Sequence, residues 1–452
     1  MSHQTNRMGS APLTRLIITM SVPTMISMLI GALYNIVDSM FVAQLGEDAL
    51  VAVSLVYPVQ TLLLAVAVGT GVGVNSLVAR RLGEGKIEDA QKAATHGIML
   101  AIVSWLVFAL IGFIGSNRFI SLFSTDPHVV QMGSAYSVIV TTASFGQFVS
   151  IAIEKVFQAT GQMLIPMLLQ TLGAVVNIVL DPCFIFGWGF FPKWGVAGAA
   201  VATVLGQIIV LVVYCFILKY RQCPVQFQFR HFRFSWKTVR KIYVVGIPAI
   251  IMQSIFSVVV TFFNAILAGF SQSAVSVLGV YFKLQSFVFM PIFGLSQGIM
   301  PIMGYNYGAR NIQRLNRTIQ ISVVLSCGVM AVGMCIFFLF PAQLLQLFQA
   351  SDTMLAIGVP ALRMVAVSFC FAGVDIVMAT FFQAVGMGGR SLFISVLRQI
   401  FFLLPLAWIF AQIGLNWVWV SFPISEAVSL AICLVLFFSV YKKHILPLHK
   451  VI

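Results

Sequence analysis

Five acidic residues lie inside long apolar segments of this chain, where an ionisable side chain is expensive to place. The sequence contains 12 Asp and Glu residues, most of them in polar stretches. The exceptions are Asp38, Glu154, Asp181, Asp375 and Glu426. Ionisable groups at membrane depth usually line a cavity or an ion pathway. The chemistry to expect from these residues is therefore the binding of protons, metal cations or charged solutes.

Asp38 and Asp181 are expected to lie at the same depth. Each precedes the end of its apolar segment by about five or six residues, which is roughly 8 to 9 Å at the helical rise of about 1.5 Å per residue. Each also has a polar residue four positions earlier on the same helix face, Tyr34 before Asp38 and Asn177 before Asp181. The two segments therefore present matching polar faces.

A third polar face comes from the next apolar segment, where Thr203 and Gln207 are four residues apart. Two carboxylates in one poorly solvated place cannot both be ionised cheaply, so they favour a shared proton or a neutralising cation. Carboxylate, amide, hydroxyl and phenol oxygens also suit a desolvated sodium ion, which needs several oxygen ligands. The three faces predict a site for a proton or a sodium ion. Isolated caps or satisfied polar residues remain the alternative.

Asp375 and Glu426 have two open interpretations. They face a cavity and attract a cation, or they form structural ion pairs with Arg398 or Lys283. On the first interpretation they belong to a substrate cavity, together with amide side chains from both halves of the chain. The residues assigned to that cavity are Asp375, Glu426, Gln207 and Gln285.

The elements that position these residues are membrane-spanning helices. The chain of 452 residues is 60% hydrophobic and only 8% charged, with a mean hydropathy of +1.02. Apolar runs of about twenty residues, the length that crosses a hydrocarbon core about 30 Å thick, recur along it. The expected fold is an all-α polytopic membrane protein with about twelve transmembrane helices. They are placed at roughly 13–43, 50–80, 91–115, 129–158, 162–187, 195–219, 239–270, 275–307, 313–340, 354–383, 388–411 and 415–441.

The sequence repeats itself at a fixed distance. The matched pairs include Pro23 and Pro248, and Gln60 and Gln285, and each second number minus the first is 225. Such a repeat predicts a duplicated membrane unit, with two pseudo-symmetric six-helix lobes. The lobes are assigned to residues 1–219 and 239–452, joined by a polar linker at 220–238.

The acids of the first lobe are not repeated. At the offset of 225, Asp38 falls on Phe263, beside Asn264. Asp181 falls on Leu404 where the local offset is 404 minus 181, or 223. The symmetry explains the scaffold, and the asymmetry places the ion chemistry in the first lobe.

Two repeated features affect helix packing. Gly69 and Gly73, with their counterparts Gly294 and Gly298, are one helical turn apart, so that a neighbouring helix can approach closely. Pro23 lies inside the first expected helix, where it removes a backbone hydrogen bond and allows a bend. A static bend and a hinge are both open interpretations, and Pro23 is the candidate hinge.

The basic residues collect on one side of an even-numbered topology. The net charge of +14 therefore reflects membrane orientation, and nucleic-acid binding is not expected. Both termini and the linker are predicted to be cytoplasmic. The linker run Arg230-His231-Phe232-Arg233-Phe234 is interpreted as a segment attracted to anionic lipid.

Four segments carry a resemblance to a known family. They are residues 33–41 (LYNIVDSMF), 177–182 (NIVLDP), 294–298 (GLSQG) and 304–310 (GYNYGAR). They resemble the multidrug and toxic compound extrusion (MATE) family, in its bacterial DinF-like branch, and the resemblance covers nearly the whole chain. It implies a twelve-helix antiporter of the bacterial inner membrane that exports lipophilic organic cations, driven by inward flow of H⁺ or Na⁺.

The family's cation site, carried over position by position, falls on the first-lobe polar faces. Its residues here are Asp38, Asn177, Asp181 and Thr203, with Tyr34 close by. The resemblance assigns them to ion coupling, and the first four to metal binding if the ion is Na⁺. The family's acid on the tenth helix falls on Asp375. Some members also carry an acid on the seventh helix, and this chain departs from them because it has none there.

Two other function classes compete with this interpretation. A flippase for a lipid-linked precursor shares the two-lobe architecture, but its pyrophosphate calls for several intramembrane bases, and acids outnumber Lys283 and Arg398 here. A membrane enzyme is disfavoured because no paired histidines or Ser/His set lies at depth, and no phosphate-binding loop suggests ATP. The expected partners are cationic drugs and membrane lipid, with no cofactor besides H⁺ or Na⁺, and the protein is expected to be a monomer.

Overall fold

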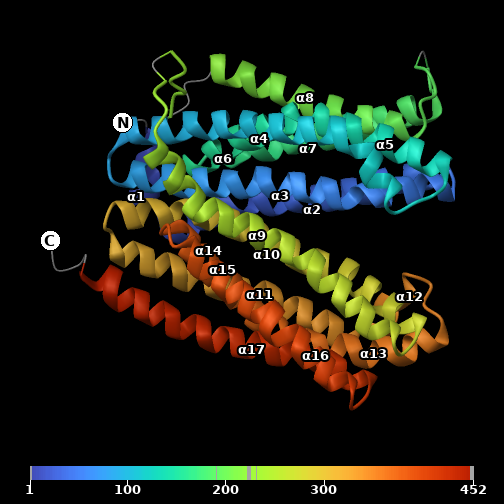
Figure 1. Cartoon of the computed structure of the whole chain (residues 1–452). Coiled ribbons are helices and arrows are strands. Elements are labelled where there is room, and N and C mark those ends of the chain that lie inside the picture. The colour runs from blue at the N-terminus through green and yellow to red at the C-terminus, as the bar shows by residue number, and fades with distance from the viewer. Residues whose placement is uncertain (1–2, 190, 221–224, 231, 448–452) are drawn as a thin grey trace. The chain divides into compact units, whose positions relative to one another are not determined.

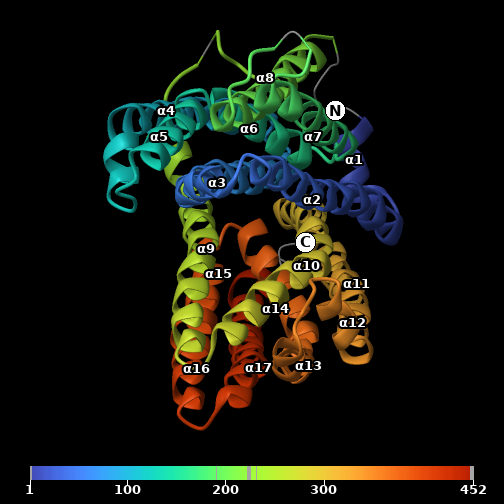
Figure 2. The same ribbon diagram turned by 90° about the vertical axis from the view of Figure 1, so that its right-hand side faces the viewer.

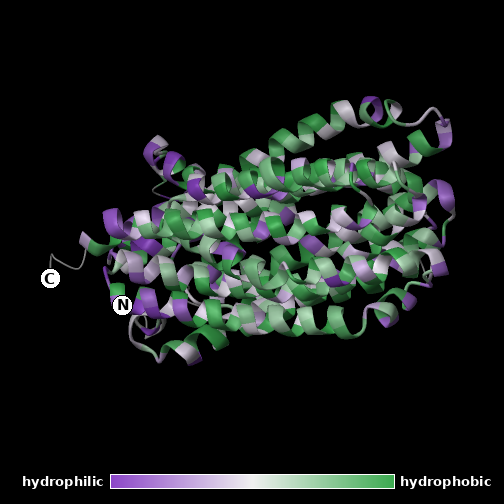
Figure 3. Ribbon diagram, turned by 90° about the horizontal axis from the view of Figure 1, so that it is seen from below, coloured by the Kyte–Doolittle hydropathy of each residue, from purple (hydrophilic) through white to green (hydrophobic). Residues whose placement is uncertain are grey.

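The computed structural model describes residues 3–189, 191–220, 225–230 and 232–447, and every regular element in these ranges is a helix. Ten of the described helices are long and apolar enough to cross a membrane. Two bent helix pairs raise the number of candidate spans to 12. Along the helices apolar residues predominate, and hydrophilic residues gather towards the ends (Figure 3). The predicted all-α membrane fold with about twelve spans is confirmed.

The helices follow one another with short connections. The first part of the chain forms α1 (His3–Ser10), α2 (Leu13–Ala43), α3 (Glu47–Gly83), α4 (Ile87–Ser121), α5 (Pro127–Thr142), α6 (Phe145–Ala159), α7 (Leu164–Phe186) and α8 (Val196–Tyr220). The second part forms α9 (Trp236–Ala268), α10 (Gln272–Gly308), α11 (Ile312–Leu339), α12 (Pro341–Gln346), α13 (Asp352–Ala366), α14 (Phe369–Ala384), α15 (Gly388–Val396), the π-helical η1 (Leu397–Leu403), α16 (Leu404–Ala411), α17 (Leu415–Val440) and the π-helical η2 (Tyr441–Ile445).

Two spans that the sequence pattern presents as single helices are bent. The angle is 42° between α5 and α6 and 47° between α13 and α14. At each break a serine hydroxyl bonds to a carbonyl three residues earlier, Ser144 to Thr141 and Ser368 to Val365. Hydroxyls that bond back to the helix backbone compete with its regular hydrogen bonds and favour a bend. Hydropathy does not report such local competition, so the sequence pattern misses both bends.

The chain forms two compact units. The first consists mainly of Ile26–Leu82 and Lys86–Ile250, and the second of Arg7–Met25, Gly83–Gly85 and the described residues from Ile251 onward. The chain passes between the units inside α2, after Met25, and inside α9, after Ile250. These crossings are related by the sequence repeat, since 250 minus 25 is 225. Each follows a proline by two residues.

In the first unit α7 packs against α8, and α8 also packs against α5 and α6 (Figure 1). The described part of the linker docks on α4. The Gln228 backbone N–H donates to Thr95 Oγ1 at 3.0 Å, and the Ser235 N–H donates to His96 Nε2 at 2.9 Å. The segment before α9 is therefore fixed to the first unit.

In the second unit α11 packs against α10 and α14, and α17 packs against α13, α14 and α16 (Figure 2). The short helix α1 belongs partly to this unit, and the sequence pattern does not predict it. Arg314 Nη2 donates to the Ala11 carbonyl at 2.7 Å and to the Met8 carbonyl at 3.2 Å. These bonds satisfy carbonyl groups at the end of α1 that have no partner within the helix.

The repeated glycines allow close helix contacts inside each unit. A Cβ atom on Gly73 would collide with the Ile242 carbonyl oxygen of α9. In the second unit a Cβ on Gly298 would lie 2.9 Å from the Ser21 backbone nitrogen of α2, and the repeat counterpart of Ser21, Gly246, has its backbone nitrogen 3.1 Å from a Cβ on Gly73. The predicted role of these glycines in close helix packing is confirmed.

Candidate ion-coupling site

Three helices of the first unit bring the predicted site residues together. Asp38 and Tyr34 lie on α2, Asn177 and Asp181 on α7, and Thr203 on α8. Asp181 is fully buried and Asn177 is 3% exposed, whereas Asp38 is only partly buried. The α7 and α8 backbones approach closely where Gly206 faces Gly173 and Asn177. This contact sets Asn177 beside Thr203.

Asn177 links the second carboxylate to α8. With its amide oriented to match its neighbours, Asn177 Nδ2 donates to Asp181 Oδ2 at 2.8 Å. Its Oδ1 then accepts from the Thr203 backbone N–H at 3.1 Å and from the Thr203 hydroxyl at 3.2 Å. A buried amide satisfied on both ends holds a fixed position. Asn177 therefore orients the Asp181 carboxylate.

The two carboxyl groups are neighbours. Asp38 and Asp181 lie close enough to act electrostatically on each other, and Tyr34 lies near Thr203 and both carboxyl groups. An ionised carboxylate only accepts hydrogen bonds, so a bond between two carboxyl groups requires a proton on one of them. The second oxygen of each, Oδ1, has no hydrogen-bond partner among the described residues. The arrangement suits one shared proton, or a cation in its place.

A tyrosine and a glutamine also belong to this site. The Gln60 side chain of α3 donates to the Tyr136 hydroxyl of α5 at 3.0 Å, and the buried Tyr136 is within electrostatic reach of both carboxylates. The recurrence of Gln60 as Gln285 is a sequence signal for Gln60. Nothing in the sequence pattern singles out Tyr136, since it lies in an ordinary amphipathic stretch.

The predicted cavity residues are divided between the units. Gln207 lies in the first unit, where Gly146 of α6 packs against its backbone. Asp375 on α14, Glu426 on α17 and the partly buried Gln285 on α10 lie in the second. Their common role in binding cargo stays a prediction.

The charged residues of the second unit take two different positions. Arg398 Nη1 donates to both carboxylate oxygens of Glu426, at 3.1 and 3.2 Å, so the ion-pair interpretation describes Glu426. Lys283 instead lies over the Phe348 ring, 5.8 Å from its centre. Asp375 is 3% exposed, and neither of its oxygens has a hydrogen-bond partner among the described residues.

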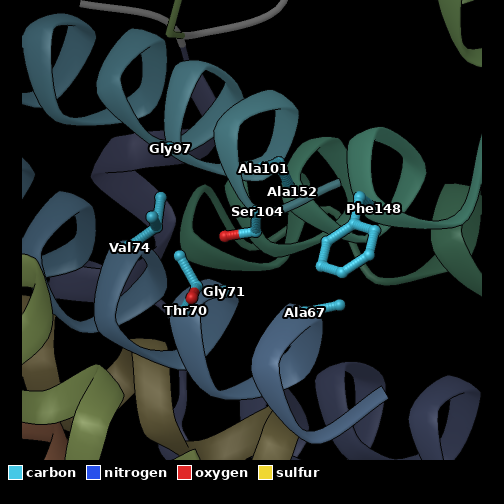
Figure 4. A pocket seen from close by; sticks show the side chains of 9 residues that line it. All are labelled: Ala67, Thr70, Gly71, Val74, Gly97, Ala101, Ser104, Phe148 and Ala152. Carbon is cyan, nitrogen blue, oxygen red and sulfur yellow. The ribbon is translucent and has the colours of Figure 1, made fainter. Parts of the chain in front are cut away.

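A small recess lies elsewhere in the first unit, between α3, α4 and α6 (Figure 4). It is lined mostly by small side chains, with Phe148 at one side and the hydroxyls of Thr70 and Ser104 among its polar atoms. Its residues are Ala67, Thr70, Gly71, Val74, Gly97, Ala101, Ser104, Phe148 and Ala152. None of them is a predicted site residue.

Known proteins resemble the chain along nearly its full length. An FAD transporter of Shewanella oneidensis is 26% identical over 92% of both chains, and the multidrug export protein MepA of Staphylococcus haemolyticus is 25% identical over 90% of this chain and 89% of MepA. A solved structure, the outward-facing conformation of a multidrug resistance MATE family transporter of the MOP superfamily, has a TM-score of 0.91. It is 25% identical and covers 99% of each chain.

The MatE family model matches the chain twice, at residues 23–183 and 248–409. The two matches start 248 minus 23, or 225, residues apart, which is the repeat distance read from the sequence. Because these matches cover well over half of the chain, the protein belongs to the MatE family of multidrug and toxic compound extrusion transporters.

Proposed function

We propose that this protein is an antiporter that exports lipophilic organic cations across the bacterial inner membrane, driven by H⁺ or Na⁺ entering through the Asp38–Asp181 site. The observation that carries the proposal is the pair of neighbouring, electrostatically interacting carboxyl groups, with Asp181 fully buried and hydrogen-bonded to Asn177. The relative MepA, which is named as a multidrug export protein and matches this chain over about nine-tenths of its length, supports the cargo class.

The coupling step rests on neutralisation of the pair. Binding of an external H⁺ or Na⁺ removes the repulsion between two carboxylates in a poorly solvated place. An ion that binds one conformation of the transporter more tightly shifts the population towards that conformation. This difference in affinity is sufficient to drive the conformational change. Pro23 is the proposed hinge, because it interrupts the backbone hydrogen bonds of α2 two residues before that helix passes into the first unit.

The second part of the proposal concerns the charge of the cargo, which is expected to be positive. Asp375 is a buried acid without a hydrogen-bonding partner among the described residues, and Asp375 and Glu426 together outnumber the Arg398 guanidinium near them, which favours a cation over an anion. The relative named as an FAD transporter marks the opposite possibility, since FAD carries a negatively charged pyrophosphate. The two relatives named above are transporters of drugs or of a nucleotide cofactor, and neither name supports the flippase alternative.

The test is export from proteoliposomes under imposed gradients. Counterflow of a fluorescent organic cation is followed with a proton gradient and a sodium gradient applied separately, and FAD is supplied as the anionic competitor. Asp38→Asn and Asp181→Asn should fold and reconstitute, yet lose most of the gradient-driven export. Asn264→Ala, beside the repeat-related position of Asp38, is the matched control and should export nearly as the unaltered protein does.

Two results would contradict the proposal. Full gradient-dependent export by both aspartate variants would remove the Asp38–Asp181 pair as the coupling site. Export of FAD in place of the cation would leave the transporter assignment intact and overturn the cargo.

A further inference from the structure

The ion pair of the second unit lies where the sequence repeat places a counterpart of the ion-coupling site. At the local offset of 223, Leu404 corresponds to Asp181. The helices α8 and α17 each begin after a glycine with positive φ, Gly195 and Gly414, which are 414 minus 195, or 219, residues apart. Glu426 therefore corresponds to Gln207, one helical turn after Thr203. At the offset of 225, Phe263 corresponds to Asp38. The second unit therefore has an acid at this place, but on a different helix of the repeat.

The space that Asp38 takes in the first unit is filled by an aromatic ring in the second. Phe263 is fully buried, and its ring centre lies 5.0 Å from that of Phe422 and 6.5 Å from that of Trp419. A packed aromatic cluster leaves no oxygen ligand there. A second site built like that of the first unit is thus absent from the corresponding described positions.

Glu426 has instead a positively charged partner in its own protein. Arg398 bonds to both of its oxygens, and the two side chains are only 21% and 15% exposed. Arg398 lies in the π-helical segment Leu397–Leu403, a rare helix geometry that is frequent at functional sites. Arg398 holds its charge at every physiological pH.

The surroundings of the pair contain other groups that titrate. Asp375 and Cys433 act electrostatically on Arg398, and Tyr281 is within electrostatic reach of Glu426. In the first unit, by contrast, the described contacts of Asp38 and Asp181 are to each other and to neutral amide and hydroxyl groups. Glu426 is thus balanced by a fixed positive charge, whereas no positively charged group is among the described contacts of Asp38 and Asp181.

We propose that Arg398 is a tethered cation that takes, for Glu426, the place that the mobile coupling ion takes between Asp38 and Asp181. A mobile ion is thereby not needed at Glu426. The assignment of the mobile ion to Asp38 and Asp181 rests on the proposed function, whereas the state of Glu426 can be tested without any transport. Removal of the guanidinium leaves a buried carboxylate without compensation, which is costly, so Glu426 would then take up a proton.

Infrared spectroscopy of the full-length protein in lipid tests this directly, because a protonated carboxyl group has its own carbonyl stretching band. Spectra between about pH 5 and pH 8 are compared for the unaltered protein, Glu426→Gln, Arg398→Gln, Arg398→Lys and the double variant Arg398→Gln/Glu426→Gln. We expect Arg398→Gln to gain one protonated carboxyl per protein. The double variant and Arg398→Lys, which keeps the positive charge, should not gain it.

Two outcomes would overturn the proposal. One is an Arg398→Gln spectrum that matches that of the unaltered protein. The other is a pH-dependent carboxyl band in the unaltered protein that Glu426→Gln removes, because Glu426 would then bind a mobile proton itself. This second comparison does not require Arg398→Gln to fold. Failure of the proposed function, seen as full export by the Asp38 and Asp181 variants, leaves both spectral comparisons valid.

Discussion

Asn177 is the residue that joins the carboxylates of the candidate site to a third helix. Its amide donates to Asp181 at 2.8 Å and accepts twice from Thr203. Hydrogen bonds to a charged group contribute about 1.5 to 3 kcal/mol. Loss of this bond destabilises the ionised carboxylate. For a coupling proton we therefore expect Asn177→Ala to tighten the apparent affinity by roughly ten- to a hundredfold, at about 1.4 kcal/mol per factor of ten. The measurement is the ion concentration that gives half-maximal export.

The control for this variant is an amide on the same helix. Gln170 lies two turns before Asn177 on α7, is partly buried, and faces Gly31 rather than a carboxylate. Gln170→Ala should change the half-maximal ion concentration by less than a factor of about three. If both variants behave alike, the amide acts through general packing of α7 and not through Asp181.

At the scale of helices, the close contacts of the repeated glycines predict how substitutions there affect the stability of the protein. Alanine at Gly73 places a methyl group against the Ile242 carbonyl, and alanine at Gly298 places one against the α2 backbone at Ser21. Overpacking of this kind costs about 1 to 3 kcal/mol. Gly73→Ala and Gly298→Ala should each lower the apparent unfolding temperature of the purified protein, by similar amounts because their contacts are related by the repeat.

Glycines that face open space provide the comparison. A Cβ on Gly115 of α4 or on Gly328 of α11 meets nothing within 4 Å. Alanine has a better helix propensity than glycine, so Gly115→Ala and Gly328→Ala should leave the unfolding temperature unchanged or slightly raised. Equal losses at all four positions would show that glycine itself, and not close packing, is what these helices require.

The sequence predicts the elements well where composition controls them and poorly where single contacts do. Hydropathy over about twenty residues locates the spans, and the acids at depth locate Asp38 and Asp181, because both signals follow from the cost of polar groups in lipid. The bend at Ser144, the docking of α1 by Arg314 and the place of Tyr136 depend on contacts between distant residues. A single sequence carries no signal for such contacts.

At the scale of the molecule, the duplication and the chemistry follow different rules. The repeat recurs in the glycine contacts, in the two bent spans and in the crossings after Met25 and Ile250. The charges at depth do not repeat position by position, since the first unit contains Asp38, Asp181 and the Lys155–Glu154 ion pair, and the second contains Asp375 and the Arg398–Glu426 ion pair. Packing thus retains the symmetry of a duplicated unit, whereas the placement of charge has diverged between the two copies.

The orientation of the whole chain in the membrane is the last prediction. Basic residues concentrate at both ends and in the linker, and such segments stay on the cytoplasmic side. Gln44, just after α2, and Gln226, in the linker, are both exposed, so each accepts a reporter. In a parent protein with its seven cysteines replaced, an impermeant thiol reagent should label Gln44→Cys in intact cells. It should label Gln226→Cys only after the membrane is opened. Labelling of both positions from outside would contradict the predicted topology, because it would place the linker, with its contacts to Thr95 and His96, on the same side of the membrane as Gln44.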